Sequence, residues 1–363
     1  MKKNKNYVDL KDQPVPEGQH LLEVDDLKMY FHTEDGVVRA VDGVSYTLDR
    51  GETLGVVGES GSGKSVTAMT IMGLISMPPG KIEGGDVRYR GRSILEMTEE
   101  EMQHIRGNDI AMIFQDPMTS LNPVYKIGKQ VGEGLRMHRR YSKQAALKCP
   151  TELFDPVCIP EPEKRVNEYP HQFSGGMRQR VMIAMALACD PDILIADEPT
   201  TALDVTIQAQ IIELMQEMQE KNGNAIIMIT HDLGVVADMA DKIMVMYAGR
   251  PVEFGTAEEI FYESRHPYTW GLIRSIPEQA IDEKKPLTPI HGNPPSLMNL
   301  PEGCVFSPRC PYATDKCRKQ RPERFVTESG HYSACHYAGD PEFLKNAPVT
   351  SRTRKDSKKG GEA

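Results

Sequence analysis

The sequence predicts a protein of the α/β class, in which a parallel sheet carries a phosphate-binding loop. A glycine-rich segment at residues 58–65 stands between a short apolar run and a longer helical pattern. Two further apolar runs, at residues 193–196 and 225–229, are each followed by polar side chains. Apolar runs of this length that alternate with helical segments are typical of a parallel sheet with helices on both faces.

The glycine-rich segment fits the phosphate-loop pattern, in which a glycine and any four residues are followed by Gly-Lys-Ser. Its residues are Gly58, Glu59, Ser60, Gly61, Ser62, Gly63, Lys64 and Ser65. A buried strand is expected at residues 53–57 and a helix at residues 66–75. Glycines let backbone N–H groups surround phosphate oxygens, and a helix N-terminus adds partial positive charge. Lys64 can then reach the β- and γ-phosphates, and the Ser65 hydroxyl can bind Mg²⁺.

The composition is that of a globular protein with room for one large or two to three small domains. The chain has 363 residues, is 39% hydrophobic and carries a net charge of −9, which argues against a dedicated nucleic-acid binder. The apolar runs at residues 182–188 and 225–230 are far too short to span a membrane. No apolar segment follows the basic N-terminus, so we expect no signal peptide. The odd count of seven cysteines favours a reducing compartment over a disulfide framework.

An antiparallel layer is expected ahead of the phosphate loop, after a loose N-terminal arm at residues 1–20. Its strands are predicted at residues 21–24, 37–41 and 44–48, with a further strand and turn at residues 81–95. Tyr30 and Phe31 end the first strand. Either ring could stack on a purine, although an aromatic residue there more often serves packing.

Polar side chains follow three of the expected parallel strands. Gln115 comes after residues 110–114, Asp197 and Glu198 close residues 192–198, and His231 follows residues 225–230. Ligands of open α/β sheets lie at the carboxyl ends of the strands, so these side chains should meet Lys64 there. Asp197 suits a water-mediated Mg²⁺ shell and Glu198 a general base for water. Gln115 can approach the bound nucleotide or its Mg²⁺, although taken alone it would be an ordinary loop residue. His231 is expected to touch the γ-phosphate, although a lone histidine is usually structural.

A mostly helical insertion is expected at residues 119–186. Helices are predicted at residues 124–137 and 142–147, before a break at Pro150, Pro156, Pro160 and Pro162. Ser174, Gly175 and Gly176 then open a helix over residues 177–189, with Ser174 as its N-cap. This helix N-terminus is either a second phosphate site or a simple helix start.

Together these segments resemble the nucleotide-binding subunits of ATP-binding-cassette (ABC) transporters. Residues 58–65 match Walker A, residues 194–198 Walker B, and residues 174–176 the family signature. Gln115 falls at the Q-loop, Asp204 ends the D-loop and His231 is at the switch position. The resemblance implies a RecA-like core and a head-to-tail dimer with two bound ATP molecules. It also implies that Phe31, or failing it Tyr30, stacks on adenine and that Val66 lies at the nucleotide.

Longer segments resemble the importers of dipeptides and oligopeptides, a group that includes nickel importers. They are residues 114–123, 169–180, 196–206 and 303–311, the last similar to the tail of peptide-importer D subunits. The resemblance implies an ATPase on the cytoplasmic side of the membrane, bound to two transmembrane permease subunits and a second ATP-binding subunit, and served by an extracytoplasmic peptide-binding protein. Nickel or another small solute stays open as cargo. A soluble, non-transport ABC ATPase is disfavoured by the acidic charge and the single cassette.

The chain departs from the family pattern at a few positions. Phe173 and Met177 replace the commoner leucine and glutamine of the signature and leave its Ser-Gly-Gly intact. Pro150 and Pro156 interrupt a segment that is helical in relatives, which puts the packing of the insertion in doubt.

Four cysteines gather in the loop-rich C-terminal part. A segment so poor in regular structure can bury little core and needs another source of stability. Four thiolates suit an iron–sulfur cluster or tetrahedral zinc. The four cysteines are Cys304, Cys310, Cys317 and Cys335, with His331 and His336 as the nearest substitutes. Close Cys-x-x-Cys pairs are absent, which weakens zinc, and free thiols stay open. The resemblance to peptide-importer D subunits implies a [4Fe–4S] cluster. We therefore expect a nucleotide-binding domain at residues 21–262, a cysteine-containing domain at residues 263–340 and a disordered basic tail at residues 341–363.

Overall fold

An eight-stranded sheet forms the centre of the molecule. The computed structural model describes residues 10–11, 13–116, 120–139, 141–200, 205–276 and 290–348, and the elements below refer to these. The strand order is β11-β12-β10-β9-β3-β8-β7-β6, and β9, β3, β8, β7 and β6 run parallel. The bounds are β3 Thr53–Val57, β6 Ile110–Ile113, β7 Ile193–Asp197, β8 Ala225–Thr230, β9 Lys242–Tyr247, β10 Arg250–Thr256, β11 Phe325–Val326 and β12 Tyr332–Ser333.

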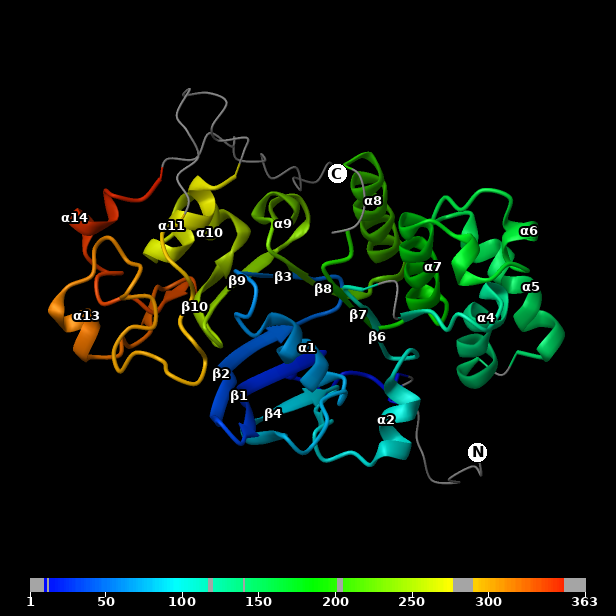
Figure 1. Ribbon diagram of the computed structural model, residues 1–363, viewed down its shortest axis with the longest axis horizontal. Coiled ribbons are helices and arrows are strands. Elements are labelled where there is room, and N and C mark those ends of the chain that lie inside the picture. Colours follow the sequence, from blue (N-terminus) through cyan, green and yellow to red (C-terminus); the bar gives the residue numbers. More distant parts are fainter. Residues whose placement is uncertain are drawn as a thin grey trace.

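A second, antiparallel sheet packs against one face of the central sheet, as Figure 1 shows in blue and cyan. In the described residues its order is β2-β1-β4-β5. The strands are β1 Leu22–Thr33, β2 Gly36–Leu48, β4 Gly80–Tyr89 and β5 Arg92–Ser93. The predicted antiparallel layer is therefore confirmed, with strands longer than the apolar runs that indicated them.

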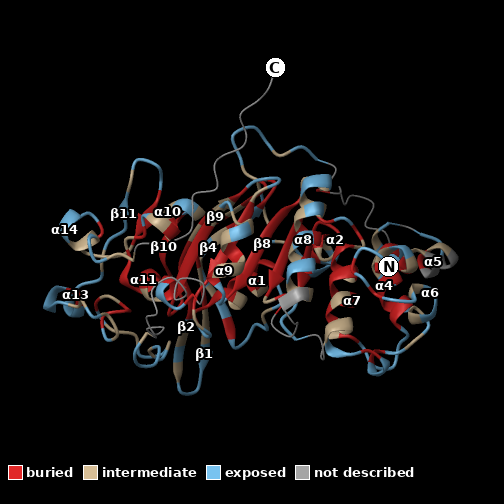
Figure 2. Cartoon of the chain, turned by 90° about the horizontal axis from the view of Figure 1, so that it is seen from above, coloured by how far each residue is buried: buried red, intermediate tan, exposed pale blue. Residues whose placement is uncertain are grey.

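The buried strands divide their side chains between two cores. In β7, Ile193 and Ile195 pack with the antiparallel sheet, whereas Leu194 and Ala196 face the opposite core. This alternation follows from the two-residue period of a strand, and it explains why β7 is apolar throughout. Figure 2 shows these strands buried between exposed outer surfaces.

Helices cover both faces of the central sheet. On the side of the antiparallel sheet lie α1 (Lys64–Ile71) and α2 (Glu99–Ile105), whose apolar residues join that core. The opposite face is covered by α8 (Val205–Asn222), α9 (Leu233–Met239), α10 (Ala257–Tyr262) and α11 (Pro267–Arg274). No helix in the described part of the chain is long and apolar enough to cross a membrane.

The predicted helical insertion is present beyond β6 as a lobe at one end of the molecule, green in Figure 1. It contains α4 (Ile127–His138), α5 (Lys143–Phe154), α6 (Pro162–Arg165), a 3₁₀ turn (Pro170–Gln172) and α7 (Gly175–Leu187).

The predicted break at Pro150 is wrong, because α5 continues through this proline. Proline lacks the N–H that would bond to the carbonyl oxygen four residues back, here that of Ala146. That oxygen lies against Gly132 of α4, where an added Cβ would come within 2.0 Å. Gly132 of α4 therefore lies directly against the Ala146 carbonyl oxygen, which receives no hydrogen bond from Pro150. The lobe accommodates the proline through this close helix contact.

The C-terminal part is built into the cassette. Strand β12 pairs with β10, with Glu253 opposite Ser333, and so extends the central sheet. His331 and Glu253, both buried, form a pair of 3.0 Å between Nε2 and Oε1. The prediction of disorder from residue 341 is wrong for its first residues, because α14 (Pro341–Leu344) places Phe343 against Trp270 with ring centroids 5.2 Å apart. Residues 349–363 lie outside the described residues. Helix α13 (Asp315–Lys319) carries Cys317, one of the four cysteines of this part.

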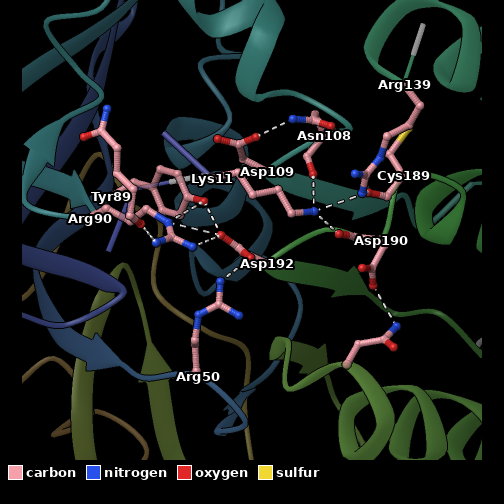
Figure 3. Close-up of polar contacts among 12 residues, drawn as sticks. Lys11, Arg50, Tyr89, Arg90, Asn108, Asp109, Arg139, Cys189, Asp190 and Asp192 are labelled. Carbon is pink, nitrogen blue, oxygen red and sulfur yellow. Dashed lines mark hydrogen bonds and ion pairs between the residues drawn. The ribbon is translucent and has the colours of Figure 1, made fainter. Parts of the chain in front are cut away.

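A buried charge network joins several layers at the start of β7 (Figure 3). Asp192 accepts hydrogen bonds from Tyr89 (2.6 Å), Arg90 (2.5 Å) and Arg50 (2.6 Å). Lys11, from the expected loose arm, reaches the carbonyl oxygen of Cys189 at 3.3 Å. Burial disfavours the charged form of Asp192, but the hydrogen bonds and nearby guanidinium groups outweigh it and hold its pKa below the usual range.

Replacing Asp192 by alanine should destabilise the protein by ~3 kcal/mol or more, because it leaves the buried Arg90 without its carboxylate partner. Thermal unfolding followed by circular dichroism measures this loss. The exposed pair Asp315–Arg318 offers a control, and Asp315→Ala should have little effect. A depressed pKa means that the contribution of Asp192 is present above its unfolded pKa of about 3.9 and fades as the pH falls below it. Equal stability of Asp192→Ala and the wild type at pH 7 would contradict the assignment.

Candidate active site

The phosphate loop joins β3 to α1 in a conformation that its glycines make possible. Gly58, Gly61 and Gly63 have φ values of 152°, 75° and 100°. An added Cβ on Gly58 would come within 2.2 Å of the Met246 carbonyl oxygen, and one on Gly63 within 2.3 Å of that of Ala40. The loop is therefore pressed against neighbouring backbone on its outer side. Side chains are excluded there, and backbone N–H groups remain for an anion on the inner side.

Two polar groups of the loop fit a phosphate ligand. The buried Lys64 ammonium donates to the loop's own carbonyl oxygens, at 2.7 Å from Gly58 and 3.0 Å from Glu59. Burial lowers the pKa of Lys64, although nearby carboxylates oppose the shift. The buried hydroxyl of Ser62 has no hydrogen-bond partner in the structure. An anion in the loop would supply one and would also solvate the Lys64 charge.

The next strand end supplies a candidate Mg²⁺ site. Ser65 Oγ donates to Asp197 Oδ1 at 2.9 Å, so the hydroxyl of α1 and the carboxylate of β7 already meet. Burial raises the pKa of Asp197. A hydroxyl and a carboxylate beside a phosphate site match the oxygen ligands that Mg²⁺ prefers. Asp197 and Ser65 are the residues that would hold the ion.

Glu198 lies between the two other predicted strand-end residues. Its Oε2 accepts from Gln115 Nε2 at 2.9 Å, and its Oε1 lies 3.3 Å from His231 Nδ1. Glu198 has a φ of 48°, which turns the chain sharply at the end of β7, and its N–H donates to the Ile229 carbonyl oxygen at 2.8 Å. The structure thus brings Gln115, Glu198 and His231 together at the same edge of the sheet as Lys64 and Asp197.

Other predicted site residues lie elsewhere or outside the described residues. Ser174 and Gly175 of the signature are exposed at the start of α7, where Ser174 caps the helix and Gly175 faces open space. Asp204 lies outside the described residues. Tyr30 donates its hydroxyl to Asp42 at 3.0 Å, whereas Phe31 packs half-buried beside the core of the antiparallel sheet.

All four C-terminal cysteines line one pocket, together with His336 and several aromatic rings. They are Cys304, Cys310, Cys317 and Cys335. In the part of the chain that the structure describes, no group of three or more histidine, cysteine or acidic residues is arranged as a metal site. Of the two substitute ligands, His331 is committed to Glu253. The predicted thiols thus lie in one pocket, but their arrangement in the described residues is not that of a metal site.

Sequence reasoning missed two contacts to the phosphate loop from the C-terminal part. Arg309 forms a bidentate ion pair with the Glu59 carboxylate, at 2.5 and 2.9 Å. The hydroxyl of Tyr268 accepts from the Glu59 N–H at 2.9 Å. Arg309 stands in a segment used to recognise the family, but no pattern of spacing links it to a loop so distant in the sequence.

The phosphate loop, the polar strand ends and the helical lobe between them define an ATP-binding cassette. The family model "ABC transporter" matches residues 41–201, and the model "Oligopeptide/dipeptide transporter, C-terminal region" matches residues 252–317. The chain belongs to the family of ABC transporter ATP-binding proteins, in its oligopeptide and dipeptide branch.

Curated relatives extend over most of the chain. Oligopeptide transport ATP-binding protein OppD of Bacillus subtilis is 57% identical over 312 residues, covering 86% of this chain and 87% of its own. Dipeptide transport ATP-binding protein DppD of Escherichia coli is 50% identical over 320 residues, covering 88% and 97%. Among solved structures, a dimeric ATP-binding cassette in a post-hydrolysis state with ADP and Pi is 27% identical, with a TM-score of 0.60 over 65% of this chain and 98% of that one. The predicted family and fold class are confirmed.

Replacing Gly63 by alanine should weaken ATP binding about tenfold or more, because the new Cβ meets backbone and the loop must shift. Titration with a fluorescent ATP analogue measures the affinity. Gly330→Ala is a matched control, since Gly330 also has a positive φ of 91° but open space around it. Retention of wild-type affinity in Gly63→Ala would show that the loop does not need this conformation.

Proposed function

We propose that the chain is the ATP-hydrolysing subunit of an importer that carries dipeptides and oligopeptides across the cytoplasmic membrane. The observation that carries the ATPase assignment is the position of Glu198, held by Gln115 and His231 at the edge of the sheet where Lys64 and Asp197 also lie. The cargo is argued from the relatives, which are named for oligopeptide and dipeptide transport.

In this proposal each strand end has a separate task. The loop N–H groups and Lys64 bind the phosphates, and Ser65 with Asp197 holds Mg²⁺, which offsets phosphate charge when it is bound. Glu198 accepts the proton of the attacking water. Gln115 and His231 hold the two carboxylate oxygens of Glu198 and so orient the base toward the phosphate site.

The exposed signature fits a nucleotide on another subunit. Ser174 and Gly175 are open to solvent at a helix N-terminus, which is a site for phosphate. A relative of known structure forms a dimer with ADP and Pi, which supports pairing of this chain with an identical or related ATP-binding subunit. Phe31 is the proposed adenine platform, because the hydroxyl of its neighbour Tyr30 is bound to Asp42.

The remaining partners follow from the proposed role in peptide import. The ATPase acts at the cytoplasmic face of the membrane, docked on two permease subunits, and an extracytoplasmic peptide-binding protein delivers the cargo. The net charge of −9 agrees with a role that involves no nucleic acid.

Replacing Glu198 by glutamine should lower ATP hydrolysis by about 100-fold or more while ATP affinity is kept, because the amide cannot accept the proton. A phosphate-release assay and nucleotide titration measure the two quantities separately. Glu213, exposed on α8, provides the control Glu213→Gln, which should hydrolyse ATP normally. Unchanged turnover in Glu198→Gln would refute the role of the base. Peptide uptake by vesicles that contain the whole transporter tests the cargo.

The cysteine pocket is proposed to hold a [4Fe–4S] cluster. Four cysteines line it, and burial raises the pKa of Cys310 to about 11 and that of Cys335 to about 12. Burial in this pocket therefore favours neutral thiols, and cluster assembly must release their protons. Soft thiolate ligands suit iron–sulfur clusters, whereas zinc or free thiols are the alternatives that measurement would separate.

Anaerobic purification should yield about four irons per chain and a broad absorbance at about 400 nm. Iron, sulfide and zinc analysis provides the numbers. Cys317→Ser should lose the iron, because Cys317 lies in the pocket, whereas Cys158→Ser should keep it, because Cys158 is exposed elsewhere. One zinc per chain, or no metal, would contradict the cluster and leave the ATPase proposal standing.

A further inference from the structure

The phosphate loop is tied to the C-terminal part through a single residue, Glu59. Its carboxylate receives both terminal nitrogens of Arg309, at 2.5 Å (to Oε2) and 2.9 Å (to Oε1). The Arg309 side chain is 5% exposed and that of Glu59 28%, so the pair is largely shielded from water. Bidentate pairs of this kind fix geometry as well as adding energy.

The backbone of Glu59 is held as well. Its N–H donates to the hydroxyl of Tyr268 at 2.9 Å, and its carbonyl oxygen accepts from Lys64 at 3.0 Å. Tyr268 is fully buried and packs on Tyr247, with ring centroids 4.7 Å apart. The side chain and both backbone groups of one loop residue thus have partners, two of them from the C-terminal part. The first turn of the phosphate loop takes its position from these partners.

Arg309 is itself positioned by several groups. It donates to the carbonyl oxygens of His291 (2.9 Å) and Ile290 (3.2 Å) and to the Tyr247 hydroxyl (3.3 Å). With so many donors satisfied, the guanidinium has little freedom to follow a displaced Glu59. Arg309 therefore holds the Glu59 carboxylate, and with it the phosphate loop, in one position.

The segment that carries Arg309 also carries two of the pocket cysteines. The N–H groups of Arg309 and Cys310 both donate to the Phe306 carbonyl oxygen at 3.0 Å, and that of Cys304 donates to the Cys317 carbonyl oxygen at 2.8 Å. A tight turn therefore places cysteines on one side and Arg309 on the other. This turn is the short, hydrogen-bonded path that joins the pocket thiols to Arg309.

We propose that Arg309 is a positioning residue for the ATPase, which sets the shape of the phosphate loop through Glu59 and links ATP binding to the state of the cysteine pocket. This inference rests on the proposed ATPase function. It does not depend on which metal, if any, the pocket holds. ATP binding and ligand binding at the cysteines are then coupled, and each changes the affinity of the other by the same factor. The reaction rate of the thiols reports this coupling without having to change by that factor.

The first test compares the ATP kinetics of Arg309 variants in the full-length protein. Arg309→Gln should raise the KM for ATP about tenfold, equivalent to about 1.4 kcal/mol, with kcat nearly unchanged. Arg309→Lys, which keeps the charge but loses the bidentate geometry, should fall between it and the wild type. The double variant Glu59→Gln/Arg309→Gln should be no worse than the more impaired single variant, because both changes remove one interaction.

A matched control separates this role from general damage. Arg318→Gln removes an exposed arginine that pairs with Asp315 at 3.0 Å in the same C-terminal part, and it should leave KM unchanged. An unchanged KM in Arg309→Gln, or additive effects in the double variant, would overturn the inference. Absence of ATP hydrolysis in the wild type would instead overturn the proposed function.

The second test reads the coupling from the cysteines. ATP should change the accessibility of the four pocket cysteines in the wild type and should leave it unchanged in Arg309→Gln. The readout is the rate of reaction with iodoacetamide, measured by mass spectrometry, for free thiols, and the rate of iron or zinc loss to a chelator where the cysteines hold a metal. The exposed Cys158 serves as an internal reference in each sample. Nucleotide concentrations are set well above the measured KM of each variant, so that both are saturated. The same ATP effect in both proteins, or no effect in the wild type, would overturn the link.

Discussion

Parallel pairing of the central strands is the constraint on which the site depends. In register, Val57 of β3 lies opposite Thr230 of β8, and Asp197 of β7 lies opposite Ile229. Since these strands end side by side, whatever follows each of them is delivered to one edge of the sheet. Five polar groups that are scattered along the sequence thereby become neighbours. The backbone hydrogen bonds between the strands align their ends, so the site residues are brought together without depending on contacts among their own side chains.

The opposite end of β7 carries the charge network around Asp192. The same strand therefore has its nucleotide-facing carboxylates at one end and, at the other, a buried anchor to the antiparallel sheet through Arg90. Lys11 and Arg139 add the N-terminal arm and the helical lobe, both through the carbonyl oxygen of Cys189. A displacement of the lobe or of the antiparallel sheet acts on the strand that positions Glu198. The antiparallel sheet, the N-terminal arm and the helical lobe are thus all connected to the segment that begins β7.

Much of the fold was predictable because it depends on local pattern. The apolar runs marked the parallel strands, the glycine loop marked the phosphate site, and strand ends indicated Glu198 and His231. The C-terminal strands were missed because β11 and β12 have two residues each, too few for any periodicity. The helix through Pro150 was missed because its tolerance lies in a neighbouring glycine. The Arg309–Glu59 pair was missed because sequence carries no mark of a contact between such distant residues.

The pairing of β12 with β10 bears on how such proteins can be recombined. A tail that merely followed the cassette could be exchanged between relatives at any loop after α10. Here the tail supplies strands of the central sheet, the histidine that pairs with buried Glu253, and rings that cover Trp270. A chimera joined after α10 would take one half of the strand pair and one half of the ion pair from a foreign sequence, whereas Trp270 and the rings that cover it would move together. A successful exchange would have to move β10 and its partners together. Recombination of tails between relatives is therefore restricted to sequences that already match where β10 meets β12.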